Sequence, residues 1–187
     1  MRIEQLRKNY EIRVRWIAFP LHPETPEEGL TLEELFAGRP IDIEKVLEHL
    51  RQVADELGLP FGELKKTYSS RLAQELAKWA ESKGKGCSFH EAIFRAYFVD
   101  GINIGKVDEL VDRAKSVGLP EKEVRSVLEL RTFKEAVDSD WLRSRTLGIT
   151  VVPTFVIDHQ AIVGAQSYEV LEQFLINCGI KKRRNPD

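Results

Sequence analysis

The stretch Gly148-Ile-Thr-Val-Val-Pro-Thr-Phe-Val-Ile157 decides the fold, because it places a proline at the head of an apolar, β-branched run. Proline has no N–H to donate to a ladder of hydrogen bonds, so Pro153 must lie where a strand lacks such a bond. Residues 158–160 then form a turn signal, and a second apolar run follows at 161–163. The pattern predicts a β-hairpin that begins next to Pro153.

A single helix closes the sequence after the hairpin. Ser167 is a suitable N-cap, and Val170, Leu171, Phe174 and Leu175 share one face of residues 168–177. The basic run from Lys181 to Arg184 that follows is typical of a solvated tail.

The block before the hairpin, from Leu30 to about Leu147, is expected to be almost entirely helical. Apolar residues recur there at intervals of three and four. The helices that this spacing predicts cover residues 42–57, 69–82, 88–98, 106–117, 121–129 and 132–147. Asp42 is expected to cap the first of them, and Ser69 or Ser70 the second.

The start of the chain has a different pattern. Residues 1–9 indicate the end of a short helix, and residues 11–17 alternate strictly between the two faces of a strand. Pro20, Pro23 and Pro26 then predict an extended, ordered loop.

The early strand and the late hairpin must share one sheet, because neither is stable alone. The sequence therefore predicts an α/β domain built from residues 1–39 and 148–187. Residues 40–147 would form a large all-helical insertion into that domain.

Composition limits the classes of function. The 187 residues hold 28 Lys and Arg against 30 Asp and Glu, so the net charge of −2 gives no general reason to bind nucleic acid or an anionic membrane. No apolar run approaches the roughly 18 residues of a membrane span, and the charged first residues are unlike a signal peptide. We expect a protein that works in the cytoplasm.

Several segments together resemble one known family. The segments are residues 16–29, residues 89–105, residues 147–158 around Pro153, and the hairpin return Val163-Gly-Ala-Gln166. They are similar, in the same order, to FrnE-like members of the DsbA family, which have a thioredoxin-like fold.

The resemblance implies chemistry and a binding loop. The family exchanges thiols and disulfides through a CxxC motif at the start of the first helix, where the helix N-terminus favours the thiolate. It also implies that the Val152–Pro153 bond is cis and that Val152, Pro153 and Thr154 form the substrate-binding loop. From the residues alone, Pro153 could also be an ordinary proline at the start of a strand.

The sequence contains no CxxC motif, so no catalytic residue can be named in it. Its two cysteines, Cys87 and Cys178, are 91 positions apart. We expect Met1 to be an internal methionine, with the natural start and the CxxC upstream and the thioredoxin-like fold incomplete at this N-terminus. The alternative is a protein that has lost the motif and completes its sheet in another way, such as a homodimer.

Three functions stay open on this basis. The first is a thiol–disulfide oxidoreductase that acts on a thiol or disulfide protein, or on a small thiol, and needs no cofactor. The second is a glutathione-dependent enzyme that resembles 2-hydroxychromene-2-carboxylate isomerase or the kappa-class glutathione transferases, which use a serine in place of the first cysteine. The third is a redox-inactive module that binds an extended peptide.

The remaining candidate residues favour structural roles. Cys87 and Cys178 are expected to be small buried hydrophobes. His22 lies in the proline-rich loop, near the edge of the active site that the resemblance implies, but nothing supports a catalytic or metal-binding role for it. The Ser69-Ser70-Arg71 run is expected to open a helix.

Overall fold

The computed structural model describes residues 2–183, which form two compact units. The first unit comprises Met1–Leu21 and Asp140–Asp187 and is called the hairpin unit below; the second, His22–Ser139, is called the helical unit. The first boundary between the units lies after residue 21, whereas the sequence predicted it after residue 39; the second lies after residue 139 rather than 147. The first boundary comes earlier because residues 30–31 pair with residues 66–67 of the helical unit. The domain limits themselves stay a prediction.

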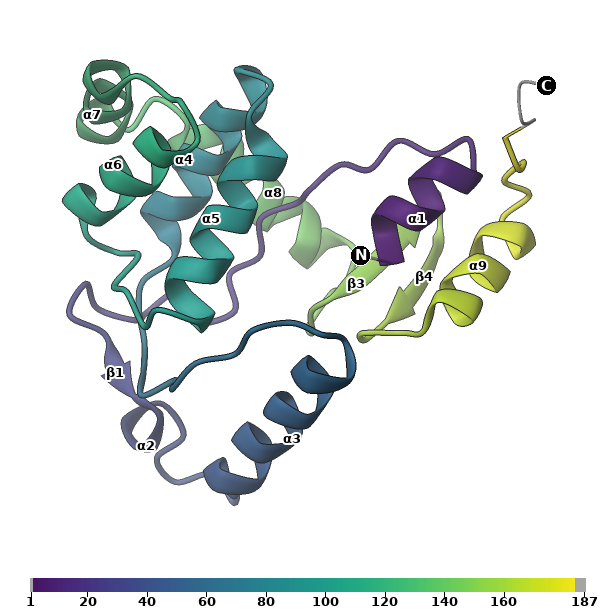
Figure 1. Cartoon of the computed structure of the whole chain (residues 1–187), viewed down its shortest axis with the longest axis horizontal. Helices are drawn as coiled ribbons and strands as arrows, with labels where there is room; N and C mark the ends of the chain where they lie inside the picture. Colours follow the sequence, from purple (N-terminus) through teal and green to yellow (C-terminus); the bar gives the residue numbers. More distant parts are fainter. Residues whose placement is uncertain (1, 184–187) are drawn as a thin grey trace. The chain divides into compact units, whose positions relative to one another are not determined.

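The helical unit contains the predicted run of helices and one short sheet (Figure 1). The bounds of its elements are β1 Leu30–Thr31, α2 Leu32–Leu35, α3 Ile43–Glu56, β2 Lys66–Thr67, α4 Arg71–Ser82, α5 Gly86–Phe98, α6 Val107–Ser116, α7 Glu121–Leu130 and the first half of α8 Lys134–Thr146. The six predicted helices are confirmed. The antiparallel pair β1–β2 was not expected, and it joins the end of the proline-rich loop to the helical unit.

The core of the helical unit lies between α4, α5, α6 and α7. The spacing of three and four that predicted these helices also turns their apolar residues inward: Leu76, Phe89 and Leu110 have no exposed surface. A close backbone approach completes the packing, because Gly62 donates its N–H to the carbonyl of Phe98 at 2.8 Å. A Cβ atom at Gly62 would overlap the carbonyl of Val99.

The hairpin unit consists of α1 Arg2–Asn9, the second half of α8, the strands β3 Thr154–Ile157 and β4 Gln160–Val163, and α9 Tyr168–Asn177. The two strands pair antiparallel, with Phe155 opposite Ile162. Helices α1 and α9 lie beside them (Figure 1). The four buried residues of this small core are Leu6, Tyr10, Leu171 and Leu175. The predicted hairpin and closing helix are confirmed.

The strand predicted for residues 11–17 is wrong, and so is the shared sheet. These residues are extended but have no ladder partner, and the described chain contains two separate two-stranded sheets. The backbone of this region pairs instead with the C-terminal segment: Glu11 donates its N–H to the carbonyl of Lys181, and Arg183 donates to Asn9. Alternating residues indicate a half-buried face, but a strand also needs a neighbour.

The sequence analysis expected no membrane-spanning segment, and the length and hydropathy of the helices can be compared with that expectation. Among residues 2–183, no helix is both long enough and apolar enough to cross a bilayer. The last residue of the predicted basic tail, Arg184, lies outside the described residues.

Candidate functional site

The predicted binding loop connects α8 to β3 in the hairpin unit. Helix α8 ends at Thr146, and Gly148 has a positive φ of 66°, a conformation that glycine adopts without steric cost. The peptide bond between Val152 and Pro153 is cis. Strand β3 begins at Thr154, so Pro153 lies just outside the ladder, as the sequence requires of a residue without an N–H.

Hydrogen bonds hold the two sides of the loop but leave its centre open. Gly164 donates its N–H to the carbonyl of Pro153 at 2.8 Å, and the Thr154 hydroxyl donates to the carbonyl of Val151 at 2.7 Å. Within residues 2–183, neither the N–H nor the C=O of Val152 has a backbone partner. Val152 is 45% exposed and Val151 is 49% exposed.

An exposed peptide group at the head of a strand can bind another extended chain. Its N–H can donate to that chain and its C=O can accept from it, while exposed valine side chains supply apolar contact. A loop of this kind can hold and orient a polypeptide but supplies no nucleophile. The three predicted residues Val152, Pro153 and Thr154 therefore lie together in a geometry suited to binding; their role as the binding loop stays a prediction.

Both cysteines are free thiols, and neither lies in this loop. Cys178 is half-buried at the C-cap of α9. Cys87 was expected to be buried, but it is exposed in the first turn of α5. The reason is the helix register: α5 begins at Gly86, and Gly86, Phe89 and Ile93 turn inward, which leaves Cys87 on the outer side.

His22 belongs to the helical unit. Its ring lies edge-on to Phe36, with 6.4 Å between the ring centroids. Burial, followed by the charge of Arg39, lowers the pKa of His22 below its ordinary value, so the neutral form is favoured. Among residues 2–183, no group of three or more His, Cys, Asp or Glu side chains is arranged to hold a metal ion.

A buried carboxylate in the hairpin unit was missed by the sequence reasoning. Asp140 is only 2% exposed, and its Oδ2 accepts a hydrogen bond from the backbone N–H of Ala18 at 2.9 Å. Its Oδ1 lies 3.6 Å from the guanidinium of Arg15. Asp140 thus fixes the extended segment that precedes the proline-rich loop. The sequence alone does not indicate such a contact, because it shows only a single acidic residue within an amphipathic helix.

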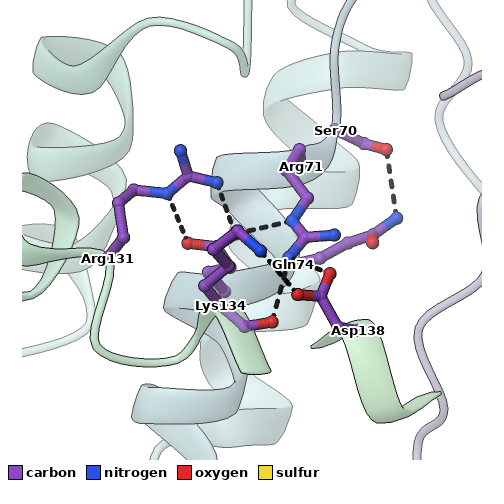
Figure 2. A network of polar contacts seen from close by, with 7 residues as sticks. Ser70, Arg71, Gln74, Arg131, Lys134 and Asp138 are labelled. Atoms are coloured by element: carbon purple, nitrogen blue, oxygen red, sulfur yellow. Dashed lines mark hydrogen bonds and ion pairs between the residues drawn. The ribbon is translucent and has the colours of Figure 1, made fainter. Parts of the chain in front are cut away.

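The helical unit contains a second unexpected polar cluster, centred on Glu75 of α4. Figure 2 shows its members Arg71, Arg131, Lys134 and Asp138. Arg131 donates from Nε to Glu75 Oε2 at 2.7 Å and from Nη2 to Oε1 at 2.6 Å, and Arg71 Nε also donates to Oε1. Arg71 and Lys134 both reach Asp138 at 2.7 Å. The cluster joins α4, the α7–α8 turn and the start of α8.

Electrostatics keep Glu75 ionised although it is buried. Burial raises the pKa of a carboxyl group, but the hydrogen bonds from Arg131 and Arg71 outweigh burial, and the pKa of Glu75 falls below its ordinary value. Arg131 has a positive φ of 50°, which is uncommon outside glycine, and it makes two hydrogen bonds to Glu75 from this conformation. Every group of the cluster binds another, so its role is structural.

The chain matches a family model and is similar to known proteins. The family model described as DSBA-like thioredoxin domain matches residues 1–176. The uncharacterized protein YwbO of Bacillus subtilis (strain 168) is 28% identical over 183 residues, which cover 96% of this chain and 88% of that protein.

Two solved structures are similar as well. The probable DsbA oxidoreductase SCO1869 from Streptomyces coelicolor superimposes with a TM-score of 0.76 and 26% identity, over 89% of this chain and 74% of that one. A 2-hydroxychromene-2-carboxylate isomerase superimposes with a TM-score of 0.72 over 95% of this chain and 85% of that one; at 16% identity this likeness concerns the fold. The expected α/β, thioredoxin-like fold with a helical insertion is confirmed, and the chain belongs to the DSBA-like thioredoxin domain family.

Proposed function

We propose that the protein is a thiol–disulfide oxidoreductase of the FrnE-like branch of its family, with Val152, Pro153 and Thr154 as the loop that binds the substrate. The observation that carries the proposal is that neither the backbone N–H nor the C=O of Val152, a residue that is 45% exposed, has a backbone partner within residues 2–183. Family membership and the likeness to the Streptomyces protein support the chemistry.

In this reaction a thiolate attacks one sulfur of a disulfide, forms a mixed disulfide and releases the other sulfur as a thiol. A second thiol then resolves the mixed disulfide, so one thiol pair is oxidised while one disulfide is reduced. The sequence holds no CxxC, and Cys87 and Cys178 belong to different units. The proposal therefore assigns neither of them the attack, and requires a cysteine pair from outside these 187 residues.

The substrate loop sets the substrate class. A backbone donor and acceptor flanked by apolar side chains suit an extended thiol- or disulfide-containing polypeptide more than a small thiol. The reaction needs no cofactor beyond the cysteine pair, and a reducing compartment such as the cytoplasm would keep that pair available for exchange.

The deciding experiment uses the protein purified from its native host. Its intact mass is compared with 21.4 kDa, its alkylatable thiols are counted, and its reduction of insulin disulfides is followed. A larger mass, two further thiols and turnover would support the proposal. A larger mass with no further thiol, together with glutathione binding by calorimetry, would replace it with the isomerase or transferase alternative.

A mass of 21.4 kDa without turnover would also overturn the proposal. The same fold would then serve as a redox-inactive module that binds peptides through the loop.

The loop itself is tested separately, in the active form. Pro153→Ala should lower kcat/KM at least about tenfold for insulin and much less for a small disulfide, because only a polypeptide uses the peptide group of Val152. Pro60→Ala, in the helical unit, is the matched control and should leave both values unchanged. Equal losses with both substrates would argue against a substrate-binding loop.

A further inference from the structure

Helix α3 has an apolar stripe that the described chain leaves largely uncovered. Its apolar residues recur at intervals of three and four: Ile43, Val46, Leu47, Leu50, Val53, Ala54 and Leu57. At about 100° per residue they share one face. Of these seven, only Ala54 is buried, while Val46, Leu50 and Leu57 are 45%, 40% and 41% exposed.

No helix or strand of the helical unit packs extensively against α3, and the residues of this stripe other than Ala54 stay half-buried or exposed. Figure 1 shows α3 away from the group formed by α4, α5, α6 and α7, connected to it by extended chain. A helix of this length is marginal in water on its own and is normally stabilised by burying its apolar face. The N-terminus of α3 is nevertheless well formed, because the Asp42 side chain accepts a hydrogen bond from the N–H of Lys45 at 3.1 Å.

We propose that the stripe of α3 binds an amphipathic helical segment of another protein, with basic residues on both edges of its apolar face. This is the helix-in-groove type of recognition, in which apolar side chains at helical spacing anchor the partner.

The charges beside the stripe favour a basic partner. Asp42 and Glu56 lie along one edge, and Glu44 and Asp55 along the other. The two basic residues of the helix are already engaged within it: Lys45 Nζ lies 2.9 Å from Asp42, and an Arg51 nitrogen lies 3.7 Å from Glu48. Within residues 2–183, Glu44, Asp55 and Glu56 have no cationic partner, so the edges carry uncompensated negative charge.

The same charges disfavour two other occupants. In a second copy packed antiparallel, Asp42 would face Glu56 of that copy. In a parallel pair opposite edges meet, so Asp42 would lie near Glu44 and Glu56 near Asp55; like charges juxtaposed across an interface are destabilising. An anionic lipid surface would be repelled in the same way. A basic helical segment satisfies both the apolar stripe and its acidic edges.

The test measures binding of a fluorescent peptide of about 20 residues, with leucines at helical spacing and lysines at the flanking positions. The whole 187-residue chain should bind it, more weakly as salt is raised. Leu50→Asp should weaken binding at least about tenfold, because it places a charge among apolar contacts. Glu56→Lys should weaken it several-fold. Leu130→Asp, at a 68% exposed position on α7, should have no effect.

Control peptides and the state of the free protein decide the outcome. A peptide with glutamates in place of the lysines should fail to bind, and so should one with the same composition in scrambled order. Equal binding of all three peptides would overturn the proposal. A concentration-dependent dimer that Leu50→Asp dissociates would assign the stripe to a second copy instead. A Tm lowered by more than about 5 °C in Leu50→Asp would show that the chain covers the stripe itself.

Discussion

The two units of this protein bury their apolar residues in different ways. The helical unit surrounds a core in which residues such as Leu76 and Phe89 have no exposed surface. The hairpin unit has a two-stranded sheet and two short helices around the much smaller cluster of Leu6, Tyr10, Leu171 and Leu175. A two-stranded sheet is marginal without packing on a helix, so α1 and α9 are essential to it.

This difference places the candidate binding loop in the less extensively packed unit. Regions with few buried contacts open at lower free energy than the core, and binding loops are commonly found there. We therefore expect the hairpin unit to unfold at lower denaturant than the helical unit. Tryptophans report on each separately: Trp79 lies in the helical unit, and Trp16 and Trp141 lie in the hairpin unit.

The largest effect is expected from Phe89→Ala in the helical core. Removing a fully buried phenylalanine should lower the free energy of unfolding by about 4 kcal/mol, measured by urea denaturation with Trp79 as the only tryptophan. Phe94→Ala, five positions along the same helix and 49% exposed, should cost about 1 kcal/mol or less. Similar losses for both variants would mean that the outer face of α5 is also packed in solution.

A slightly smaller loss is expected from Glu75→Ala. The change leaves the guanidinium groups of Arg71 and Arg131 without their shared carboxylate, and breaking such a buried pair should cost about 3 kcal/mol at pH 7. This loss is measured by the same urea denaturation, followed by the fluorescence of Trp79. The double variant Glu75→Ala/Arg131→Ala should recover part of the loss, since it removes one uncompensated charge. No recovery would show that Glu75 contributes packing rather than charge.

The contribution of Glu75 to the stability of the folded protein should change with pH in a definite direction. Because the pKa of Glu75 is lowered in the folded protein, its contribution is fully present above the ordinary carboxyl pKa of about 4.3 and is lost as pH falls through the folded value. Glu75→Gln should therefore be less stable than the parent protein at pH 7, with a difference that shrinks below about pH 4. A difference independent of pH would contradict the ionised pair.

The fold was predictable where its signal is local. Helical spacing gave six helices of the helical unit, and turn residues around Pro153 gave the hairpin and the closing helix. The strand predicted at 11–17 failed because pairing is a long-range property, and Glu11 pairs with Lys181 far along the chain. The short strand at Leu30–Thr31 was missed for the same reason, since its partner at Lys66–Thr67 carries no strand signal.

The candidate site was predictable only in part. Its three loop residues followed from proline chemistry and family resemblance. The anchors Asp140 and Glu75 could not be found, because an acid in an amphipathic helix is normally solvated, and only the fold brings Ala18 or Arg131 to it. The exposure of Cys87 was missed because the start of α5 was placed two residues too late.

An intermediate loss is expected from Leu175→Ala in the hairpin unit. Leu175 is 5% exposed, but its cluster is small and can partly close around the change, so a loss of about 2 kcal/mol is expected. Fluorescence of Trp16 and Trp141, in a Trp79→Phe background, should show an earlier transition, while the Trp79 transition of the helical unit stays in place. Ile176→Ala, its exposed neighbour, should change neither. If both transitions shifted together, the units would unfold as one.

The smallest effect separates two serines that the sequence alone treats alike. Ser167 caps α9 by accepting a hydrogen bond from the N–H of Val170 at 3.3 Å, whereas Ser70, the N-cap of α4, makes no such bond and instead accepts from Gln74 Nε2. Ser167→Ala should therefore cost about 1 kcal/mol in the hairpin-unit transition. Ser70→Ala should cost only a few tenths in the helical unit, because the side chain of Gln74 can turn to water instead. Equal losses of stability in the two variants would mean that capping is decided by residue type rather than by geometry. A loss for Ser167→Ala alone would show that the hairpin unit depends on its Ser167 cap, whereas the helical unit does not depend on Ser70.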